Sequence, residues 1–439
     1  MADATPAAAA PTIRTALAHP AFRGLWAASG LYFIGNAMQG MAAAWLMVEL
    51  TGSSFLAALV QTAVFLPMFL FALPAGVLAD ITDRRRLILG ALLVQAATVA
   101  LLAVLLLLGW AGPTVVLALT FVAGCCTAML SPAWNSTVAE VLPREQLPQA
   151  ILSMSIAYNG ARALGPTLAG LVYAAAGGGW VFALAVAGAL VLAGAIAHWP
   201  PRAHPPTRLP AERLWGGTLA GLRYARHSHT ILAQLVRTMA FGGAGSALWA
   251  LLPVIGQQRL GLGAEGFGLL MGCLGPGAVA AGFVLGPLRQ RVGLAPLVAG
   301  CALVFALAMA CAGFVKVHAI VYASLVAGGA AWMAFMSTFN TATQTSAPPW
   351  VRSRAAALHI LSALGSFAIG SAFWGAVAGV AGLPAALGLA AAAMVAGLAL
   401  ARRFPLRMGA QLEVTQAQAS RFGELLVAQE PGPDDGPVA

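Results

Sequence analysis

Residues 76–86 read Gly-Val-Leu-Ala-Asp-Ile-Thr-Asp-Arg-Arg-Arg and connect two apolar stretches, residues 54–79 and 87–109. A helix needs about 20 apolar residues to cross the ~30 Å hydrocarbon core of a bilayer, and both stretches reach that length. Consecutive arginines are typical of a short loop that stays in the cytoplasm during membrane insertion. These residues therefore predict two transmembrane helices joined by a basic cytoplasmic loop.

The rest of the 439-residue chain has the same character, with 60% hydrophobic and 8% charged residues. Such a composition excludes a soluble globular domain. Because helices satisfy their backbone polar groups within lipid, the composition predicts an all-α membrane protein. Twelve transmembrane helices are expected, at residues 22–47, 54–79, 87–109, 114–138, 149–175, 180–199, 231–256, 265–288, 293–314, 318–342, 355–380 and 383–403.

The basic residues indicate the orientation. Nineteen of the 23 Lys and Arg residues fall on one side of the membrane when alternate loops are counted, and the exceptions are Arg162, Arg237, Arg259 and Lys316. Basic loops remain inside, so both termini of this multi-pass protein are expected in the cytoplasm. A single lysine and abundant alanine are typical of a GC-rich bacterial genome, which indicates the bacterial inner (plasma) membrane. The arginines form no dense patch, which excludes nucleic acid as a partner.

An internal repeat becomes visible when the chain is displaced by 205 positions, because Asn135 then aligns with Asn340 and Pro143 with Pro348. A parallel repeat of six helices predicts two pseudo-symmetric six-helix bundles. The expected segments are a cytoplasmic N-terminal segment (1–20), an N-terminal bundle (21–200), a cytoplasmic linker with an amphipathic helix (201–230), a C-terminal bundle (231–403) and a disordered cytoplasmic tail (404–439).

The loop at residues 76–86 resembles the signature G-x-L-A-D-R-x-G-R-K/R of the major facilitator superfamily, with departures at Ile81 and Asp83. The resemblance implies secondary transport by alternating access between the two bundles. It also implies a latch that holds the cytoplasmic side shut, formed by Gly76, Asp80, Arg84, Arg85 and Glu140.

Physical reasons support this latch. Asp80 can accept hydrogen bonds from the N-terminus of the helix that starts near residue 353, where the helix dipole favours an anion. Arg84 can pair with Glu140. The alternative is that the arginines serve only as a topology signal.

Residues 161–170 read Ala-Arg-Ala-Leu-Gly-Pro-Thr-Leu-Ala-Gly and resemble the G-x-x-x-G-P-x-x-G-G antiporter signature of exporters in the superfamily. Gly165, Pro166 and Gly170 match this signature. Glycines allow close helix contact and the proline bends the helix. The alternative is ordinary packing through glycine. Together with residues 45–53, 143–150 and 348–355, the motif resembles the branch that contains the enterobactin exporter and the transmembrane secretion effectors.

Polar side chains within the apolar stretches are candidates for a substrate cavity, since such groups are costly in a bilayer and usually functional. Arg162 is expected near the midplane, where Asn36, Gln39 or Asn159 would hold it and its planar fork would bind an anionic or polyphenolic substrate. The alternative is interhelical hydrogen bonding without a ligand. The candidate cavity residues are Tyr32, Asn36, Gln39, Tyr158, Asn159, Arg162, Arg237 and Asn340.

The resulting hypothesis is a secondary active exporter of a small organic molecule, such as a siderophore-like compound, an antibiotic or another metabolite. The resemblance implies proton antiport. No Asp or Glu lies near the centre of an expected span. The groups that could carry the coupling proton are therefore Glu49, His359 or the substrate itself. The alternatives are uptake or flipping of an amphipathic metabolite such as a lysolipid, and a non-transporting membrane sensor. No catalytic constellation, metal-ligand spacing or P-loop is present, so no enzyme activity, metal or cofactor is expected.

Overall fold

The computed structural model describes residues 12–199, 222–348 and 351–406. In the first of these ranges the helices are α1 (Ile13–Leu17), α2 (Pro20–Thr51), α3 (Ser54–Ile81), α4 (Arg84–Leu107), α5 (Pro113–Val141), η1 (Arg144–Gln146), α6 (Leu147–Ala176) and α7 (Gly178–His198). In the other two they are α9 (His229–Val254), η2 (Ile255–Arg259), α10 (Ala264–Val292), α11 (Leu294–Phe314), α12 (His318–Ser346), α13 (Arg352–Ala381), α14 (Leu383–Ala396), η3 (Gly397–Ala399) and α15 (Leu400–Arg403).

Local sequence accounts for where several helices begin and end. The side chain of Ser53 caps α3 and that of Asp83 caps α4, by accepting from the backbone N–H groups of Leu56 and Arg86 at 3.3 and 3.2 Å. Gly177 separates α6 from α7 and Gly382 separates α13 from α14, with φ of 84° and 83°. Because only glycine adopts this conformation readily, the tight turn recurs at the two positions that the 205-residue displacement aligns.

Eleven helices in the described residues are long and apolar enough to cross a membrane, which makes the protein a multi-pass membrane protein. Twelve spans were expected. The remaining stretch, residues 149–175, forms α6, which has 30 residues but is not among the eleven. Its polar side chains, which include Asn159 and Arg162, lower its hydropathy. The expected helix is therefore present, and its sequence is less apolar than that of its neighbours.

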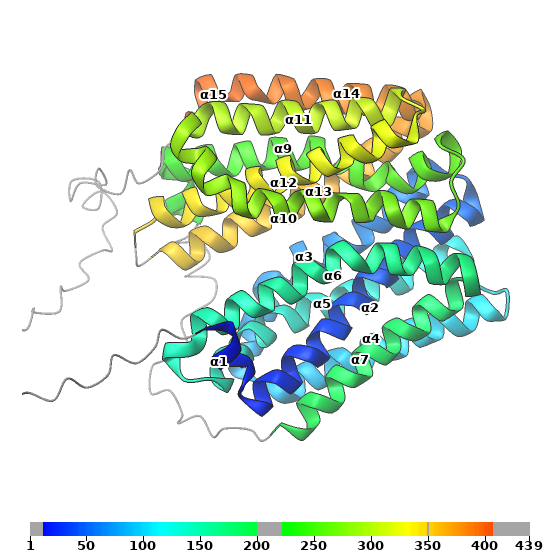
Figure 1. Ribbon diagram of the computed structural model, residues 1–439, viewed down its shortest axis with the longest axis vertical. Helices are drawn as coiled ribbons and strands as arrows, with labels where there is room; N and C mark the ends of the chain where they lie inside the picture. The colour runs from blue at the N-terminus through cyan, green and yellow to red at the C-terminus, as the bar shows by residue number, and fades with distance from the viewer. Residues whose placement is uncertain (1–11, 200–221, 349–350, 407–439) are drawn as a thin grey trace, which may run out of the picture.

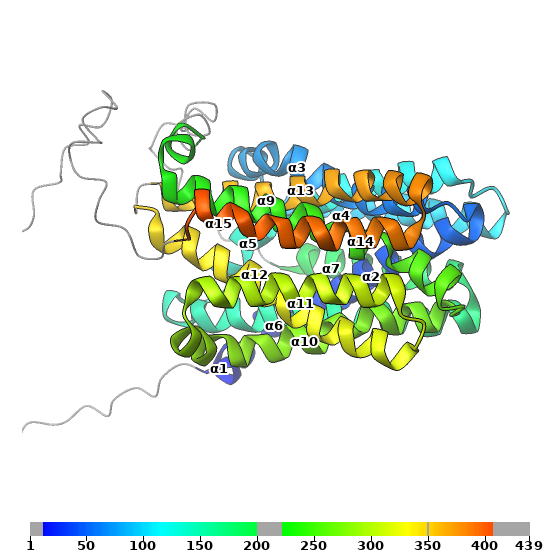
Figure 2. The ribbon, with the colours of Figure 1, turned by 90° about the horizontal axis from the view of Figure 1, so that it is seen from above.

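The helices form two groups in space (Figure 1). In one group α2 packs against α6 and α7, and α4 packs against α5 and α7. In the other α9 packs against α13 and α14, and α11 packs against α12 and α14. The two groups meet along two long helix pairs, α6 with α10 and α3 with α13. Figure 2 shows α14 and α15 on the outside of their group, and α14 belongs to the least buried of the eleven spans.

Parts of the expected organisation lie outside the described residues. These parts are residues 1–11 of the N-terminal segment, residues 200–221 of the linker with its expected amphipathic helix, and residues 407–439 of the tail.

Candidate transport site

Arg162 projects from α6 between the two groups of helices. Its side chain is exposed, and its guanidinium carbon lies 6.0 Å from the ring centroid of Tyr158 and 5.8 Å from that of Trp249 on α9. A guanidinium is attracted to the face of an aromatic ring, and each such contact contributes about 0.5–1 kcal/mol at an exposed site. The guanidinium of Arg162 thus lies near aromatic rings, whereas the sequence predicted that the amides of Asn36, Gln39 or Asn159 would hold it. Asn159 instead donates to the carbonyl oxygen of Ser155 at 2.9 Å.

Trp249 belongs to an aromatic cluster that we define as Phe65, Trp249, Trp332 and Phe367, contributed by α3, α9, α12 and α13. The centroid of Phe367 lies 4.7, 5.8 and 6.4 Å from those of Phe65, Trp332 and Trp249. A Cβ at Gly245 would lie 2.8 Å from the ring of Trp332, so this glycine makes room for the cluster. Sequence reasoning missed Trp249 and Phe367, because an aromatic residue in an apolar span usually has only a packing role.

Three predicted cavity residues of α2 lie around a small pocket. The hydroxyl of Tyr32 donates to Oε1 of Gln95 at 2.9 Å, and Nε2 of Gln95 donates to Oδ1 of Asn36 at 3.1 Å. Gln39 also lines the pocket, and Gln95, which sequence reasoning missed, comes from α4. These hydrogen bonds join α2 to α4 without a ligand, which is what the alternative to a substrate cavity predicts for these residues. Gln95 could have been found from the sequence, because it is an amide side chain within the otherwise apolar stretch 87–109.

The other predicted cavity residues belong to the second group of helices. Arg237 on α9 is 6% exposed, and its guanidinium carbon lies 5.5 Å from the ring centroid of Phe339 on α12. Next to it, the hydroxyl of Thr238 lies 3.4 Å from Nδ1 of the buried His359. Asn340 is half-buried and accepts a hydrogen bond from Gln344 at 3.0 Å. Arg237 is thus enclosed by its own group of helices, whereas Arg162 lies between the two groups.

The glycines of the α6 motif pack against two different neighbours. A Cβ at Gly165 would lie 2.6 Å from Cβ of Ala37 on α2. A Cβ at Gly170 would lie 2.5 Å from the carbonyl oxygen of Ala264, and one at Gly268 the same distance from that of Pro166. α6 and α10 therefore touch backbone to backbone. The predicted close helix contact is present, and it joins the two groups.

Further contacts join the groups at the distal end, by which we mean the helix ends opposite the Arg84–Arg86 loop. Trp45 stacks on Phe267 of α10 with centroids 5.4 Å apart and an interplanar angle of 20°. Trp45 Nε1 and the hydroxyl of Tyr173 donate to the two carboxylate oxygens of Glu49, at 2.6 and 2.5 Å. Nε2 of Gln258 in η2 donates to the carbonyl oxygen of Gly52 at 2.7 Å. Glu49 thus holds α2 and α6 together beside the contact with α10.

Comparison with known proteins shows the family to which the chain belongs. The family model of the transmembrane secretion effectors matches residues 12–439. The protein belongs to this family of major facilitator transporters. Its sequence is 27% identical over 170 residues to macrolide efflux protein A of Streptococcus pyogenes. That alignment covers 39% of this chain and 42% of the relative, so the chain matches less than half the length of that protein.

Solved structures with the same fold are transporters. The nucleoside transporter NupG superposes with a TM-score of 0.71 at 12% identity, over 88% of this chain and all of that one. A bacterial homologue of the human lysosomal transporter Spinster, in an inward-facing and unoccupied conformation, gives 0.63 at 14% identity over 87% and 94% of the two chains. The fold and the family of this chain are those of secondary transporters, which are not enzymes.

The latch residues of this secretion effector are described only in part. The side chains of Asp80 and Glu140, and that of residue 353, lie outside the described side chains, so their expected contacts stay predictions. The Nε group of Arg84 donates to the carbonyl oxygen of Ala79 at 3.3 Å, and Arg85 donates to that of Ala197 on α7. A Cβ at Gly76 would have no atom within 4 Å. These arginine contacts fasten the loop to its own group of helices.

Proposed function

We propose that the protein exports a small organic molecule across the bacterial inner membrane by alternating access. In this proposal twelve helices span the membrane, with α6 included, and both termini are cytoplasmic. The moving units are the N-terminal bundle, residues 21–200, and the C-terminal bundle, residues 231–403. The proposal is supported by the family, by the position of α6 between the bundles and by the likeness of residues 161–170 to the exporter signature.

In this proposal the structure represents the inward-facing state. The distal ends are held together by Trp45 on Phe267, by Gln258 on Gly52 and by the α6–α10 glycine contact. Toward the ends that carry α1 and α15, α6 and α10 diverge (Figure 1). Tyr158, Asn159 and Arg162, on the diverging part of α6, are all exposed. Arg162 is then accessible from the cytoplasm.

The observation that carries the proposal is the place of Arg162, an exposed arginine within a helix of the bundle interface, flanked by rings from both bundles. Its two aromatic contacts are long and weak, so a ligand can replace them at a cost of about 1–2 kcal/mol. The N–H groups at the edge of the guanidinium plane form a fork that suits a carboxylate or a catechol. Beside it, the aromatic cluster offers a surface for an apolar ring. We therefore propose an anionic or polyphenolic substrate with an apolar part.

Counterflow in sealed vesicles tests this function. Purified protein is reconstituted, and exchange of labelled aromatic acids, catechols and lipophilic cations is measured. Acids or catechols should exchange faster than cations, Arg162→Ala should abolish exchange, and Arg162→Lys, which keeps the charge without the fork, should retain part of it. The matched control is Arg402→Ala, since Arg402 is an exposed arginine at the end of α15. Exchange of cations alone, or indifference to Arg162→Ala, would refute the site, whereas flipping of a labelled lysolipid alone would favour the alternative function.

We also propose that protons drive export and that Glu49 takes part in coupling. Glu49 is a carboxylate at the contact between the bundles, and it accepts hydrogen bonds from Trp45 and Tyr173. Protonation would convert one of its two acceptor oxygens into a donor and thereby weaken this arrangement. Opening of the distal end would then depend on the proton concentration on that side of the membrane.

A further inference from the structure

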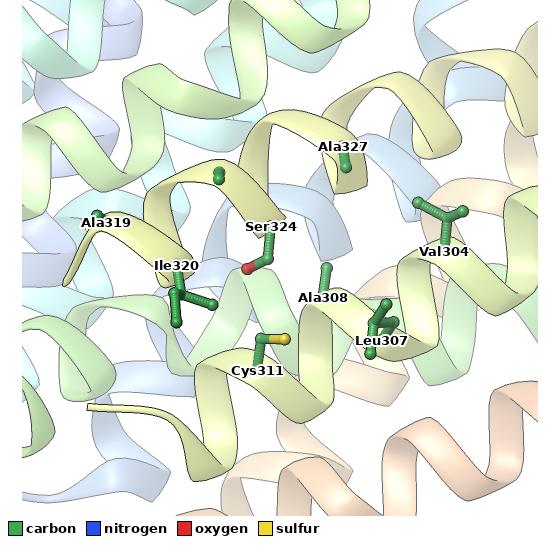
Figure 3. A pocket seen from close by; sticks show the side chains of 9 residues that line it. Val304, Leu307, Ala308, Cys311, Ala319, Ile320, Ser324 and Ala327 are labelled. Atoms are coloured by element: carbon green, nitrogen blue, oxygen red, sulfur yellow. The ribbon is translucent and has the colours of Figure 1, made fainter. Parts of the chain in front are cut away.

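A pocket lies away from the proposed transport site, between α11 and α12 (Figure 3). It has a volume of about 430 Å³. Its walls include Val304, Leu307, Cys311, Ile320 and Ser324, and the other four lining residues are alanines. The hydroxyl of Ser324 donates to the carbonyl oxygen of Val321 at 2.8 Å, so the groove presents an almost wholly apolar surface.

This groove opens toward the bilayer. Both α11 and α12 are candidate membrane spans, and the side chains of Leu307 and Ile320 at its edges are 63% and 49% exposed. The groove extends along α12 from residue 319 to residue 327. At 1.5 Å per residue this distance is about 12 Å, close to the ~15 Å thickness of the hydrocarbon of one leaflet. Its dimensions and chemistry therefore suit one acyl chain of a lipid in the leaflet at the distal end.

A positive charge lies in the loop that joins the two helices of the groove. Lys316 is the only lysine of the chain and is exposed in the short loop between α11 and α12. Cys311 and Ile320, which line the groove, lie five positions before Lys316 and four positions after it in the chain. Nε2 of His318 lies 3.1 Å from the carbonyl oxygen of Leu260, which ties this loop to the end of η2. An ammonium group at headgroup depth attracts anionic lipid, and this one stands in a loop on the side that is poor in basic residues.

We propose that the α11–α12 groove and Lys316 form a binding site for a phospholipid with an anionic headgroup. One acyl chain lies in the groove, and the headgroup phosphate lies against Lys316. The shape of the groove favours lipid over a second copy of the chain. An apolar channel about half a span long, next to a loop with an exposed ammonium, offers little surface for another helix to pack against. The site is separate from Arg162, so it does not depend on the proposed substrate.

Photocrosslinking tests this site in the full chain. The protein is placed in nanodiscs of phosphatidylcholine that contain a small fraction of phosphatidylglycerol with a diazirine in its acyl chain, and the labelled peptides are identified by mass spectrometry. Wild type should be labelled within residues 304–327. Lys316→Glu should lower this labelling about five-fold or more, because one basic residue at an anionic surface contributes about 1 kcal/mol. Ala323→Phe, which fills the groove, should lower it as well.

Matched controls separate the site from general lipid contact. Arg259→Glu changes a basic residue at the distal end, and Ala393→Phe enlarges an exposed alanine of α14. Both should leave the labelling of residues 304–327 at the wild-type level. Equal labelling in wild type and Lys316→Glu would overturn the proposal, as would equal labelling by a phosphatidylcholine probe. Formation of a Cys311–Cys311 disulfide between copies in the membrane would show that a second copy covers the groove, and would overturn it too.

Discussion

Gly268→Ala should open the distal end of the transporter. The added methyl carbon would lie 2.5 Å from the carbonyl oxygen of Pro166 and 3.0 Å from Cα of Gly170. Favourable contacts between such atoms lie near 3.5 Å, so α10 must move away from α6 by roughly 1 Å. Both atoms belong to the backbone and cannot rotate away. Overpacking of this kind costs about 1–3 kcal/mol, and the cost falls only on the state in which the two helices touch.

In a protein that alternates between two states, a free-energy cost that falls on one state changes the relative populations of the two. A difference of 1–3 kcal/mol shifts the equilibrium about 5–150-fold toward the state with separated distal ends. The matched control is Gly160→Ala in α6, the other helix of this pair, where an added Cβ would have no atom within 4 Å. Its populations should equal those of wild type.

Distances between spin labels measure this shift. Cysteines replace Ala175 and Glu265, both exposed near the distal ends of α6 and α10, in a chain whose five native cysteines are replaced. Gly268→Ala should convert a large part of the distance distribution to longer values, while Gly160→Ala should not. If Gly268→Ala lowered the unfolding temperature yet left the distances unchanged, the contact would be ordinary packing and the gating argument would be refuted.

Three further variants test the latch, the coupling and the buried network. Asp80→Asn should insert normally but slow transport, because a neutral amide binds helix N-terminal N–H groups less strongly than a carboxylate, and wild-type rates in a well-expressed Asp80→Ala protein would rule the latch out. Glu49→Gln should retain counterflow but lose proton-driven accumulation, and full accumulation would exclude Glu49 from coupling. Gln95→Leu should lower the unfolding temperature in detergent, since it leaves the polar groups of Tyr32 and Asn36 without their partner at a cost of about 1–3 kcal/mol, and an unchanged temperature would contradict this.

The positions of the helices were predictable from the sequence because they depend on local quantities. Hydropathy summed over about 20 residues decides whether a segment enters the bilayer, and basic loops bias its direction. Even α6, which is not among the eleven candidate spans, was expected within two residues of its observed ends. The turn glycines at 177 and 382 likewise act through their own backbone conformation.

The partners of the site residues were decided by tertiary structure alone. Trp249 lies 87 positions after Arg162 in the chain, and nothing in its own surroundings distinguishes it from a packing residue. Gly170 and Gly268 each look like one small residue among 50 glycines until their helices cross. The sequence indicated that a polar group within a membrane span needs a partner, but several groups can serve as that partner. Which one does so depends on how helices far apart in the chain pack together, because close packing selects among chemically equivalent partners by position.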